Sequence, residues 1–168
     1  MNIVYVGSQL SGTIDNLYVD FNSRVKKGDI LLTIEPSVLQ ATVDESKASL
    51  DSAISQRNFA KNEYERNKML YAGDMIARAE LEQSQTSYEQ AEQSVKRMQS
   101  QYERAVTNLG YATISSPVDG TVISRKVDIG QTVAASFQTP DLFEIAEDLT
   151  KMQIETAVSE ADIGVIKE

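Results

Sequence analysis

The sequence contains no cysteine and no histidine. Without cysteine there is no disulfide, no thiolate nucleophile and no cysteine metal site. Without histidine there is no histidine-dependent catalytic triad, no histidine general base and no histidine-ligated zinc. We therefore expect no catalytic residue, no metal and no cofactor, and most enzyme chemistry is excluded before any motif is considered.

An excess of positive charge is also lacking. The chain has 16 Lys and Arg against 25 Asp and Glu, a formal net charge of -9. A chain this acidic lacks the electrostatic footprint of a protein that binds nucleic acid or an anionic bilayer surface. We therefore expect no nucleic-acid partner. With 41% hydrophobic and 24% charged residues, the composition is that of a chain that folds.

Long hydrophobic runs are missing. Ile30, Leu31 and Leu32 form one of the longest apolar stretches, and a transmembrane helix needs about 20 such residues. Residues 1–6 contain no charged region followed by an apolar one, so they do not resemble a signal peptide and indicate the inside of a strand. We expect the chain to be a fragment whose native N-terminus has been removed.

The two ends of the chain repeat each other. The pattern G-T-[I/V]-x4-V-D-x-[N/G]-x2-V begins at Gly12 and again at Gly120, 108 residues later. Its valines and isoleucine favour strands, and its Asn or Gly suits a tight turn. Each copy is followed by an apolar strand, at 30–34 and 142–145. The repeat predicts one β-module whose two pseudo-symmetric halves pair with each other. Two unrelated hairpins with common turn residues are the alternative.

Between the repeats the hydrophobic period becomes helical. Residues 37–71 and 78–109 contain neither Pro nor Gly, so we predict two long helices that form an antiparallel hairpin about 50 Å long. The second helix has a strict heptad seam at Leu81, Ser84, Tyr88, Ala91, Val95, Met98, Tyr102, Ala105 and Leu109. The first has a looser seam at Leu39, Val43, Ser46, Leu50, Ala53, Arg57, Ala60 and Tyr64. Taken alone, such a hairpin is also typical of a spacer or a dimerising coiled coil.

Short signals mark the ends of these helices. Ser37 and Gln40 have the spacing of a capping box at the start of the first helix. Gly73 and Asp74 interrupt the helical pattern. Gly110 is predicted to be the C′ residue that ends the second helix.

A long hairpin between two halves of a β-module resembles the periplasmic adaptor, or membrane fusion, proteins of bacterial tripartite efflux pumps. It is most like the MacA-type adaptors of ABC transporters. Residues 113–120, Thr-Ile-Ser-Ser-Pro-Val-Asp-Gly, are similar to the family's re-entry segment from hairpin to lipoyl-like domain. Residues 148–154 and 158–163 are similar to the opening of the family's next domain, a β-barrel.

The resemblance implies an α+β fold. A biotinyl/lipoyl-like β-sandwich is split by an inserted long antiparallel α-helical (coiled-coil) hairpin and is followed by the start of a β-barrel domain. Residues 1–36 are expected to form the first lipoyl-like half, with a preceding strand from the barrel domain. Residues 37–110 are expected to form the hairpin, 111–147 the second half, and 148–168 the first part of a truncated barrel.

The resemblance also implies a function. The expected protein is a non-catalytic periplasmic adaptor that links an inner-membrane ABC transporter to a TolC-like outer-membrane channel. Several copies, six by the resemblance, assemble into a channel-forming funnel, and the native protein is anchored to the inner membrane by a segment missing here. An adaptor of an RND-type pump or of a secretion system is the alternative within the family. A coiled-coil structural scaffold is the alternative of another class.

A biotin or lipoyl carrier is a further alternative. Such a carrier displays a Lys on the tight turn between its two halves, and here the predicted hairpin replaces that turn. No D-K-A or M-K-M triplet occurs in the chain. The sequence therefore lacks the reactive amine of a carrier.

The resemblance assigns two sites. At the hairpin tip, the family motif for channel contact is Arg, Leu and Ser, and the matching residues are Arg66, Leu70 and Ala77. Arg66 offers planar donors and Leu70 an apolar knob, whereas Ala77 lacks the cap that Ser would form with Glu80. In the second half, a three-residue extension of the loop 135–140 places Gln138 where MacA-type adaptors carry a gating Gln. An ordinary polar loop is the alternative there.

Overall fold

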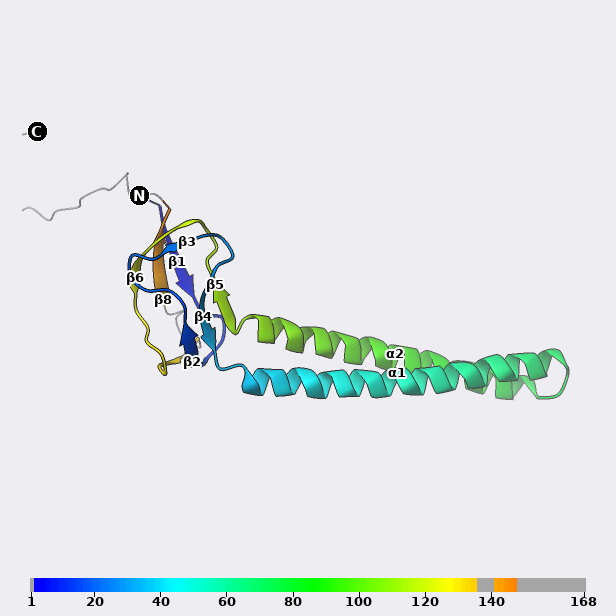
Figure 1. Ribbon diagram of the computed structural model, residues 1–168. Coiled ribbons are helices and arrows are strands. Elements are labelled where there is room, and N and C mark those ends of the chain that lie inside the picture. The colour runs from blue at the N-terminus through cyan, green and yellow to red at the C-terminus, as the bar shows by residue number, and fades with distance from the viewer. Residues whose placement is uncertain (1, 136–140, 148–168) are drawn as a thin grey trace, which may run out of the picture.

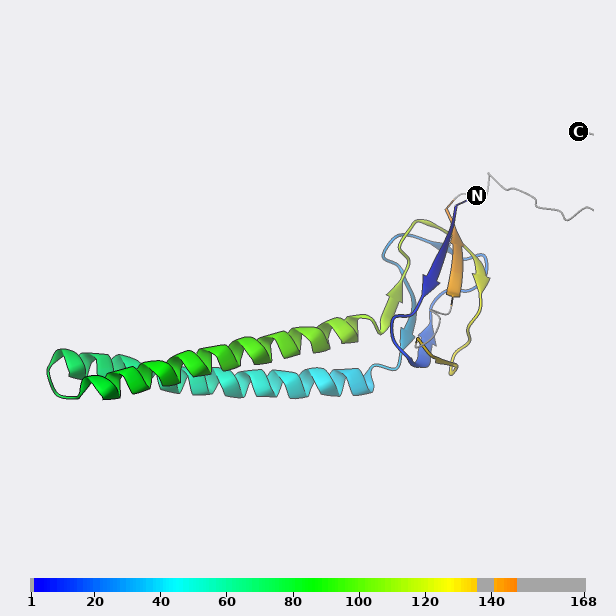
Figure 2. The same ribbon diagram turned by 180° about the vertical axis from the view of Figure 1, so that it is seen from behind.

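The structure, a computed structural model, describes residues 2–135 and 141–147 as a small β-sandwich from which a two-helix hairpin projects (Figures 1 and 2). One sheet has the order β1 (Ile3–Gly7), β8 (Asp141–Ala146), β6 (Gly120–Arg125) and β3 (Arg24–Val25). The other has the order β5 (Thr113–Ser115), β4 (Ile30–Ile34), β2 (Gly12–Leu17) and β7 (Thr132–Val133). The predicted sandwich split by a helical hairpin is confirmed. The predicted start of a barrel, 148–168, lies outside the described residues.

The two repeats exchange strands. β3 of the first half pairs with β6 of the second, and β7 of the second half pairs with β2 of the first. Equivalent backbone hydrogen bonds occur where each half pairs with the other. Ile14 N–H donates to the Gln131 carbonyl at 2.9 Å, and Val122 N–H donates to the Ser23 carbonyl at 3.0 Å. The predicted pairing of the halves is therefore confirmed, and the alternative of two unrelated hairpins is wrong.

The repeat glycines are required by close packing between strands. A Cβ on Gly12 would lie 2.5 Å from Ile34 Cγ2, and a Cβ on Gly120 would collide with the carbonyl oxygen of Ala146. In the turns that follow, Asn22 and Gly130 have φ of 65° and 80°, a left-handed conformation that Gly and Asn tolerate best. The repeat therefore encodes two strand contacts and two turns.

Arg125 joins the two copies of the repeat. Its Nε donates to Asp20 Oδ1 at 3.0 Å, and its Nη1 donates to the carboxylate of Asp128. These two aspartates occupy the same position in the repeat. The pKa of the Asp20 carboxyl is lowered, mainly by the hydrogen bond from the Phe21 backbone N–H and next by the Arg125 guanidinium.

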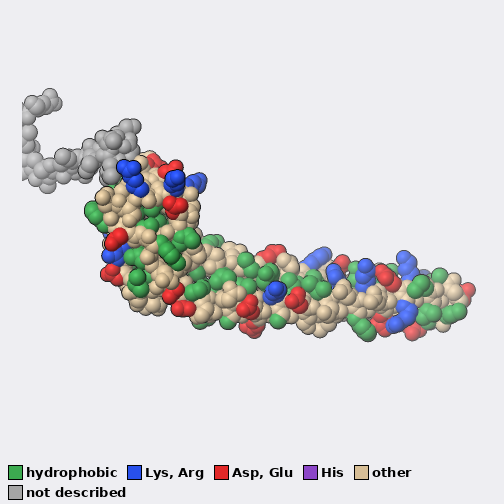
Figure 3. Space-filling view, in the orientation of Figure 1, with side chains coloured by type: hydrophobic (Ala, Val, Ile, Leu, Met, Phe, Trp, Pro, Cys, Tyr) green, Lys and Arg blue, Asp and Glu red, His purple; other side chains and the backbone are tan. Residues whose placement is uncertain are grey.

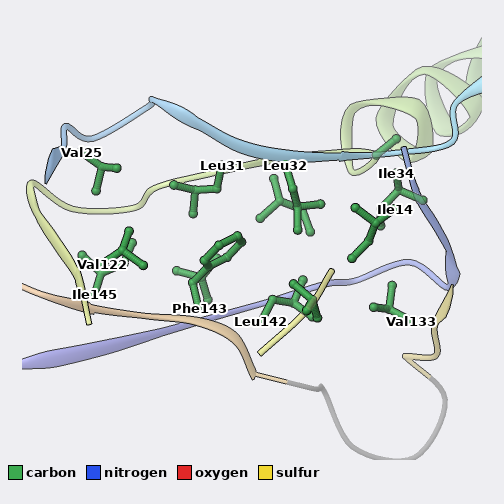
Figure 4. Close-up of a cluster of buried hydrophobic side chains, with 14 residues drawn as sticks. Ile14, Val25, Leu31, Leu32, Ile34, Val122, Val133, Leu142, Phe143 and Ile145 are labelled. Carbon is green, nitrogen blue, oxygen red and sulfur yellow. The ribbon is translucent and has the colours of Figure 1, made fainter. Parts of the chain in front are cut away.

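The core fills the space between the two sheets. Side chains of both halves point toward one another there (Figure 4). Six of them are completely buried: Leu31, Leu32, Val122, Leu142, Phe143 and Ile145. Val127 belongs to the same core cluster and Val19 packs against it, so the equivalent valines of the two repeats lie in one sandwich.

The hairpin consists of α1 (Ser37–Ala72) and α2 (Arg78–Gly110). Its helices lie side by side and antiparallel (Figure 1). Every residue of the two predicted seams is buried or half-buried, so both seams are confirmed. The rings of Tyr64 and Tyr88 stack across the helices with centroids 6.1 Å apart. Few seam residues are buried, and most of these have small side chains. The hairpin therefore buries less apolar surface between its helices than the sandwich buries between its sheets.

Two predicted helix ends differ from the structure. Ser37 is the first helical residue rather than the N-cap, because Pro36 already has a helical backbone and its carbonyl accepts the Gln40 N–H at 2.8 Å. The predicted capping box is therefore wrong. Gly110 is the last residue of α2, and the chain continues right-handed through Tyr111, so Gly110 is not a left-handed C′ residue.

Both ends of the hairpin are fixed to neighbouring strands. The chain leaves the sandwich after β4 and returns at β5, and these strands pair with Thr33 opposite Thr113. The Ile34 N–H donates to the Ala112 carbonyl at 2.8 Å. The hairpin thus has two anchored ends rather than a single flexible connection. In the described part of the chain, neither helix is apolar enough to cross a bilayer.

Candidate docking site at the hairpin tip

The tip is a five-residue turn between α1 and α2. The Leu70 carbonyl accepts the N–H groups of Gly73 at 3.1 Å and Met75 at 3.0 Å, which satisfies one of the last carbonyls of α1. Asp74, not Gly73, adopts the left-handed conformation, with φ of 55°. Asp is among the residues that tolerate this conformation. The interruption predicted at Gly73 and Asp74 is therefore confirmed.

The three residues assigned to channel contact all lie at this distal end. The Arg66 side chain is exposed, and its Nη2 lies 3.7 Å from Glu63 Oε1. Leu70 is half-buried, and Ala77 is exposed. An exposed ion pair of this length holds its partners weakly, so the Arg66 guanidinium is available to a partner. The contact of these residues with a channel stays a prediction.

Ala77 is the N-cap residue of α2, and no side chain caps this helix end. The Arg78 Nε instead donates to Glu82 Oε1 at 2.7 Å, and this bond is the main cause of the raised pKa of the Arg78 guanidinium. Glu80 lies in the first turn, where a carboxylate interacts favourably with the helix dipole. The start of α2 therefore carries a favourable charge but no side-chain cap.

The structure adds two residues that the sequence argument missed. Met69 and Met75 flank the turn with exposed fractions of 71% and 73%. Figure 3 shows hydrophobic side chains beside charged ones at this end of the hairpin. A signal was present in the sequence, because two Met residues six positions apart enclose a Gly-Asp turn. Methionine is flexible and polarizable and adapts to varied apolar surfaces. The tip therefore combines an adaptable apolar contact with an exposed, weakly paired guanidinium.

The gate residue, a metal site and a carrier lysine concern other parts of the chain. Gln138 is outside the described residues, so its role as a gate stays a prediction. In residues 2–135 and 141–147, no cluster of three or more acidic side chains is positioned to hold a metal. The segment between β4 and β5, where a carrier would display its Lys, is the hairpin itself. The tip is therefore the main candidate for function, and its side chains suit binding rather than catalysis.

The chain matches known proteins over nearly its whole length. The domain family described as RND MFP, barrel-sandwich hybrid domain, matches residues 2–143. The Macrolide export protein MacA of Yersinia pestis is 33% identical over 98% of this chain and 48% of its own length. The Pyoverdine export membrane fusion protein PvdR of Pseudomonas aeruginosa is 34% identical over 98% of this chain and 45% of its own length. The chain thus spans about half the length of these curated relatives.

Solved structures agree with the sequence matches. The crystal structure of MacA from Actinobacillus actinomycetemcomitans has a TM-score of 0.74 and 35% identity, over 98% of this chain and 55% of that one. A MacA-MexA chimeric protein, which contains the Pseudomonas aeruginosa MexA α-hairpin domain, has a TM-score of 0.62 and 38% identity. The match covers 98% of this chain and 54% of the chimera. The sandwich and the hairpin are therefore shared with both structures.

Proposed function

Because the chain belongs to the membrane fusion protein family and is MacA-like, we propose that it works as a periplasmic adaptor of an efflux pump. The adaptor links an inner-membrane transporter to a TolC-like outer-membrane channel, and the hairpin tip docks on that channel. Its role is mechanical and non-catalytic.

The shape of the hairpin carries this proposal. With 36 residues in α1 and a rise of 1.5 Å per residue, the tip lies about 50 Å from the sandwich. Both ends of the hairpin are anchored on paired strands, so the tip is held at the end of a stiff arm. An arm of this kind suits a protein that bridges two partners across a gap. Arg66, Met69 and Met75 supply exposed groups at its end.

The remaining parts of the proposal concern assembly and place. Several copies, six by the family resemblance, form a funnel in the periplasm, anchored to the inner membrane by a segment outside this chain. Gln138 lines the channel of this funnel as a gate. These steps rest on the resemblance to MacA-type adaptors.

The identity of the transporter has two candidates. Similarity to the Macrolide export protein MacA favours an ABC transporter as the partner. The description of the matching domain favours an RND-type pump, as does the Multidrug resistance protein MdtE of Escherichia coli, 28% identical over 80% of this chain. We place the ABC transporter first because the MacA match is longer and more identical. Co-purification of the full-length protein with its transporter distinguishes the two.

Site-specific crosslinking tests the docking of the tip. The absence of cysteine allows single thiols to be placed without background. Met75→Cys in the full-length protein should form a crosslink to an outer-membrane channel in cells, through a thiol-to-amine crosslinker. Thr107→Cys is the matched control, because Thr107 is exposed on the same hairpin near its base. An efflux-competent Met75→Cys protein that links to no outer-membrane protein would contradict the proposal.

A further inference from the structure

Sulfur occurs in this chain only in methionine. The sequence has five methionines and no cysteine, and Met69, Met75 and Met98 lie within the described residues. Met69 and Met75 flank the turn of the hairpin and are 71% and 73% exposed. Met98 is a half-buried residue of the α2 seam. The two most accessible of these three side chains therefore lie at the proposed docking site.

The two tip methionines border the same short turn. A Cβ placed on Gly73 would lie 3.8 Å from the Met69 carbonyl oxygen and 3.8 Å from Met75 Cγ. The Met75 backbone N–H also donates to the Leu70 carbonyl at 3.0 Å. Both residues are thus held within one turn at the distal end of the hairpin, where hydrophobic side chains lie on the surface (Figure 3).

The exposed apolar surface of the tip consists mainly of these two thioethers. In residues 66–80, which the structure describes completely, the exposed large hydrophobic side chains are Met69, Met75 and Tyr71. Tyr71 is only 39% exposed, and Leu70 is half-buried. An apolar contact made by the tip therefore involves the two methionines first.

A thioether becomes a sulfoxide in a single two-electron oxidation. A lone pair of the methionine sulfur attacks one oxygen of hydrogen peroxide, so that a sulfur–oxygen bond forms and the oxygen–oxygen bond breaks. The sulfur is oxidised and the peroxide is reduced. The departing hydroxide takes the proton of the transferred hydroxyl group and leaves as water. An apolar side chain is thereby converted into a polar hydrogen-bond acceptor.

The position of Arg66 adds a second consequence of oxidation. Arg66 and Met69 are three residues apart on α1, so their side chains are neighbours on the helix surface. The Arg66 guanidinium is exposed, and its Nη2 lies 3.7 Å from Glu63 Oε1. A sulfoxide oxygen on Met69 offers this cation an acceptor within its own helix. Oxidation therefore removes apolar surface from the tip and competes for its guanidinium.

We propose that Met69 and Met75 are sites of reversible oxidation by peroxides, and that their sulfoxides weaken the docking of the tip on the outer-membrane channel. The inference rests on the proposed docking function and adds the regulation of that site. Methionine sulfoxide reductases restore the thioethers. In that step a dithiol supplies two electrons and two protons, the sulfoxide oxygen leaves as water, and the dithiol becomes a disulfide.

Mass spectrometry tests which methionines react. The full-length protein is treated with hydrogen peroxide, and the gain of one oxygen atom is followed over time at each methionine. Met69 and Met75 should be oxidised at least about threefold faster than Met98, because peroxide reaches their exposed sulfur atoms more easily. Equal rates at the three positions would overturn the proposal. Circular dichroism should show unchanged helix content, and a loss of helix would overturn it as well.

Binding measurements test the effect on docking. The probe is the purified outer-membrane channel that Met75→Cys captures in cells. After removal of the peroxide, the oxidised full-length protein should bind this channel about tenfold more weakly than the untreated protein. Methionine sulfoxide reductases A and B with dithiothreitol should restore the affinity. An affinity that oxidation leaves unchanged, or that reduction fails to restore, would overturn the proposal.

Leucine substitutions separate the tip from the seam. Met98→Leu is the matched control, because it retains both tip methionines, and peroxide should weaken its binding as much as in the unchanged protein. Met69→Leu combined with Met75→Leu removes both sulfur atoms from the tip. Peroxide should leave the affinity of this double variant at its own value before treatment. A tenfold loss in the double variant, or no loss in Met98→Leu, would overturn the proposal.

This inference and the docking proposal fail in different ways. If Met75→Cys captures a channel and oxidation of the unchanged protein does not alter its affinity, the docking role stands and its regulation by oxidation is wrong. If Met75→Cys captures no channel, the docking role is contradicted and its regulation is overturned with it.

Discussion

The sandwich and the hairpin bury their side chains in different ways. In the sandwich, Phe143 is completely buried together with side chains of strands that lie more than 100 residues away in the sequence, such as Leu31 of β4. In the hairpin, contacts repeat along two continuous helices, and seam positions such as Ser46 and Ala53 bury little apolar surface. The comparison teaches that stability is concentrated in the sandwich, which leaves the hairpin surface free to carry recognition.

The strongest test of this difference in burial is to remove a phenyl ring from each region. Phe143→Ala should lower the free energy of unfolding by about 3–5 kcal/mol, because it leaves a cavity in a closed core. Phe59→Ala, at a side chain 71% exposed, should change it by less than about 0.5 kcal/mol. Urea unfolding of both variants measures the difference. Similar losses would mean that the hairpin has a core comparable to that of the sandwich.

Adding a methyl group at one glycine of each region should change the stability less, and the two changes should have opposite signs. Gly120→Ala forces a Cβ against the Ala146 carbonyl and should destabilise the protein by about 1–3 kcal/mol. Gly110→Ala meets no atom within 4 Å on the helix surface and should stabilise it by about 0.5–1 kcal/mol. Thermal melting followed by circular dichroism measures both. A neutral Gly120→Ala would show that β6 and β8 can move apart.

Capping the second helix sharpens the picture of the tip. Ala77→Ser places a hydroxyl at an N-cap that has no side-chain hydrogen bond, with Glu80 at the capping-box position. We expect a gain of about 1 kcal/mol in helix stability. The measurement is amide hydrogen exchange of residues 78–82. Ala77→Val is the control and should give no gain, because Val is as poor an N-cap residue as Ala. Equal protection in both variants would contradict the capping role.

The smallest expected effect concerns pH and belongs to the sandwich. The pKa of Asp20 is lowered in the folded state by the Phe21 N–H and by Arg125. Its contribution to stability is therefore present above the unfolded pKa, about 3.9, and is lost as pH falls through the lower folded pKa. Asp20→Asn should be slightly less stable than the unchanged protein at pH 7, and this difference in stability should shrink as the pH falls toward 2. An equal gap at both pH values, measured by urea unfolding, would contradict this linkage.

Much of the fold was predictable because the repeat and the heptads are local patterns with strict spacing. The repeat at Gly12 and Gly120 predicted that the halves pair, and the seams predicted which helix faces meet. Neither pattern predicted the exchange of β3 and β7 between sheets, because pairing partners depend on the three-dimensional path of the chain. The reason for the two repeat glycines was also hidden, since Ile34 and Ala146 approach them only after folding.

The tip was predictable only in outline. Arg66, Leu70 and Ala77 were assigned by resemblance, and their positions at the distal end follow from the hairpin itself. The exposure of Met69 and Met75 depends on how the turn at Asp74 rotates the chain, and sequence spacing does not specify that rotation. The caps predicted at Ser37 and Gly110 were wrong for a related reason, because a few backbone angles decide where a helix cap forms.

The position of β8 has a consequence for biosynthesis. β8 lies between β1 and β6 in its sheet, and among the described strands it is the last to be synthesised. Before β8 is synthesised, β1 lacks the strand with which it pairs. Helices α1 and α2, which need only nearby partners, are complete long before that moment. The sandwich therefore closes only when β8 is present, and a chain cut before Asp141 would lack the strand that joins β1 to β6.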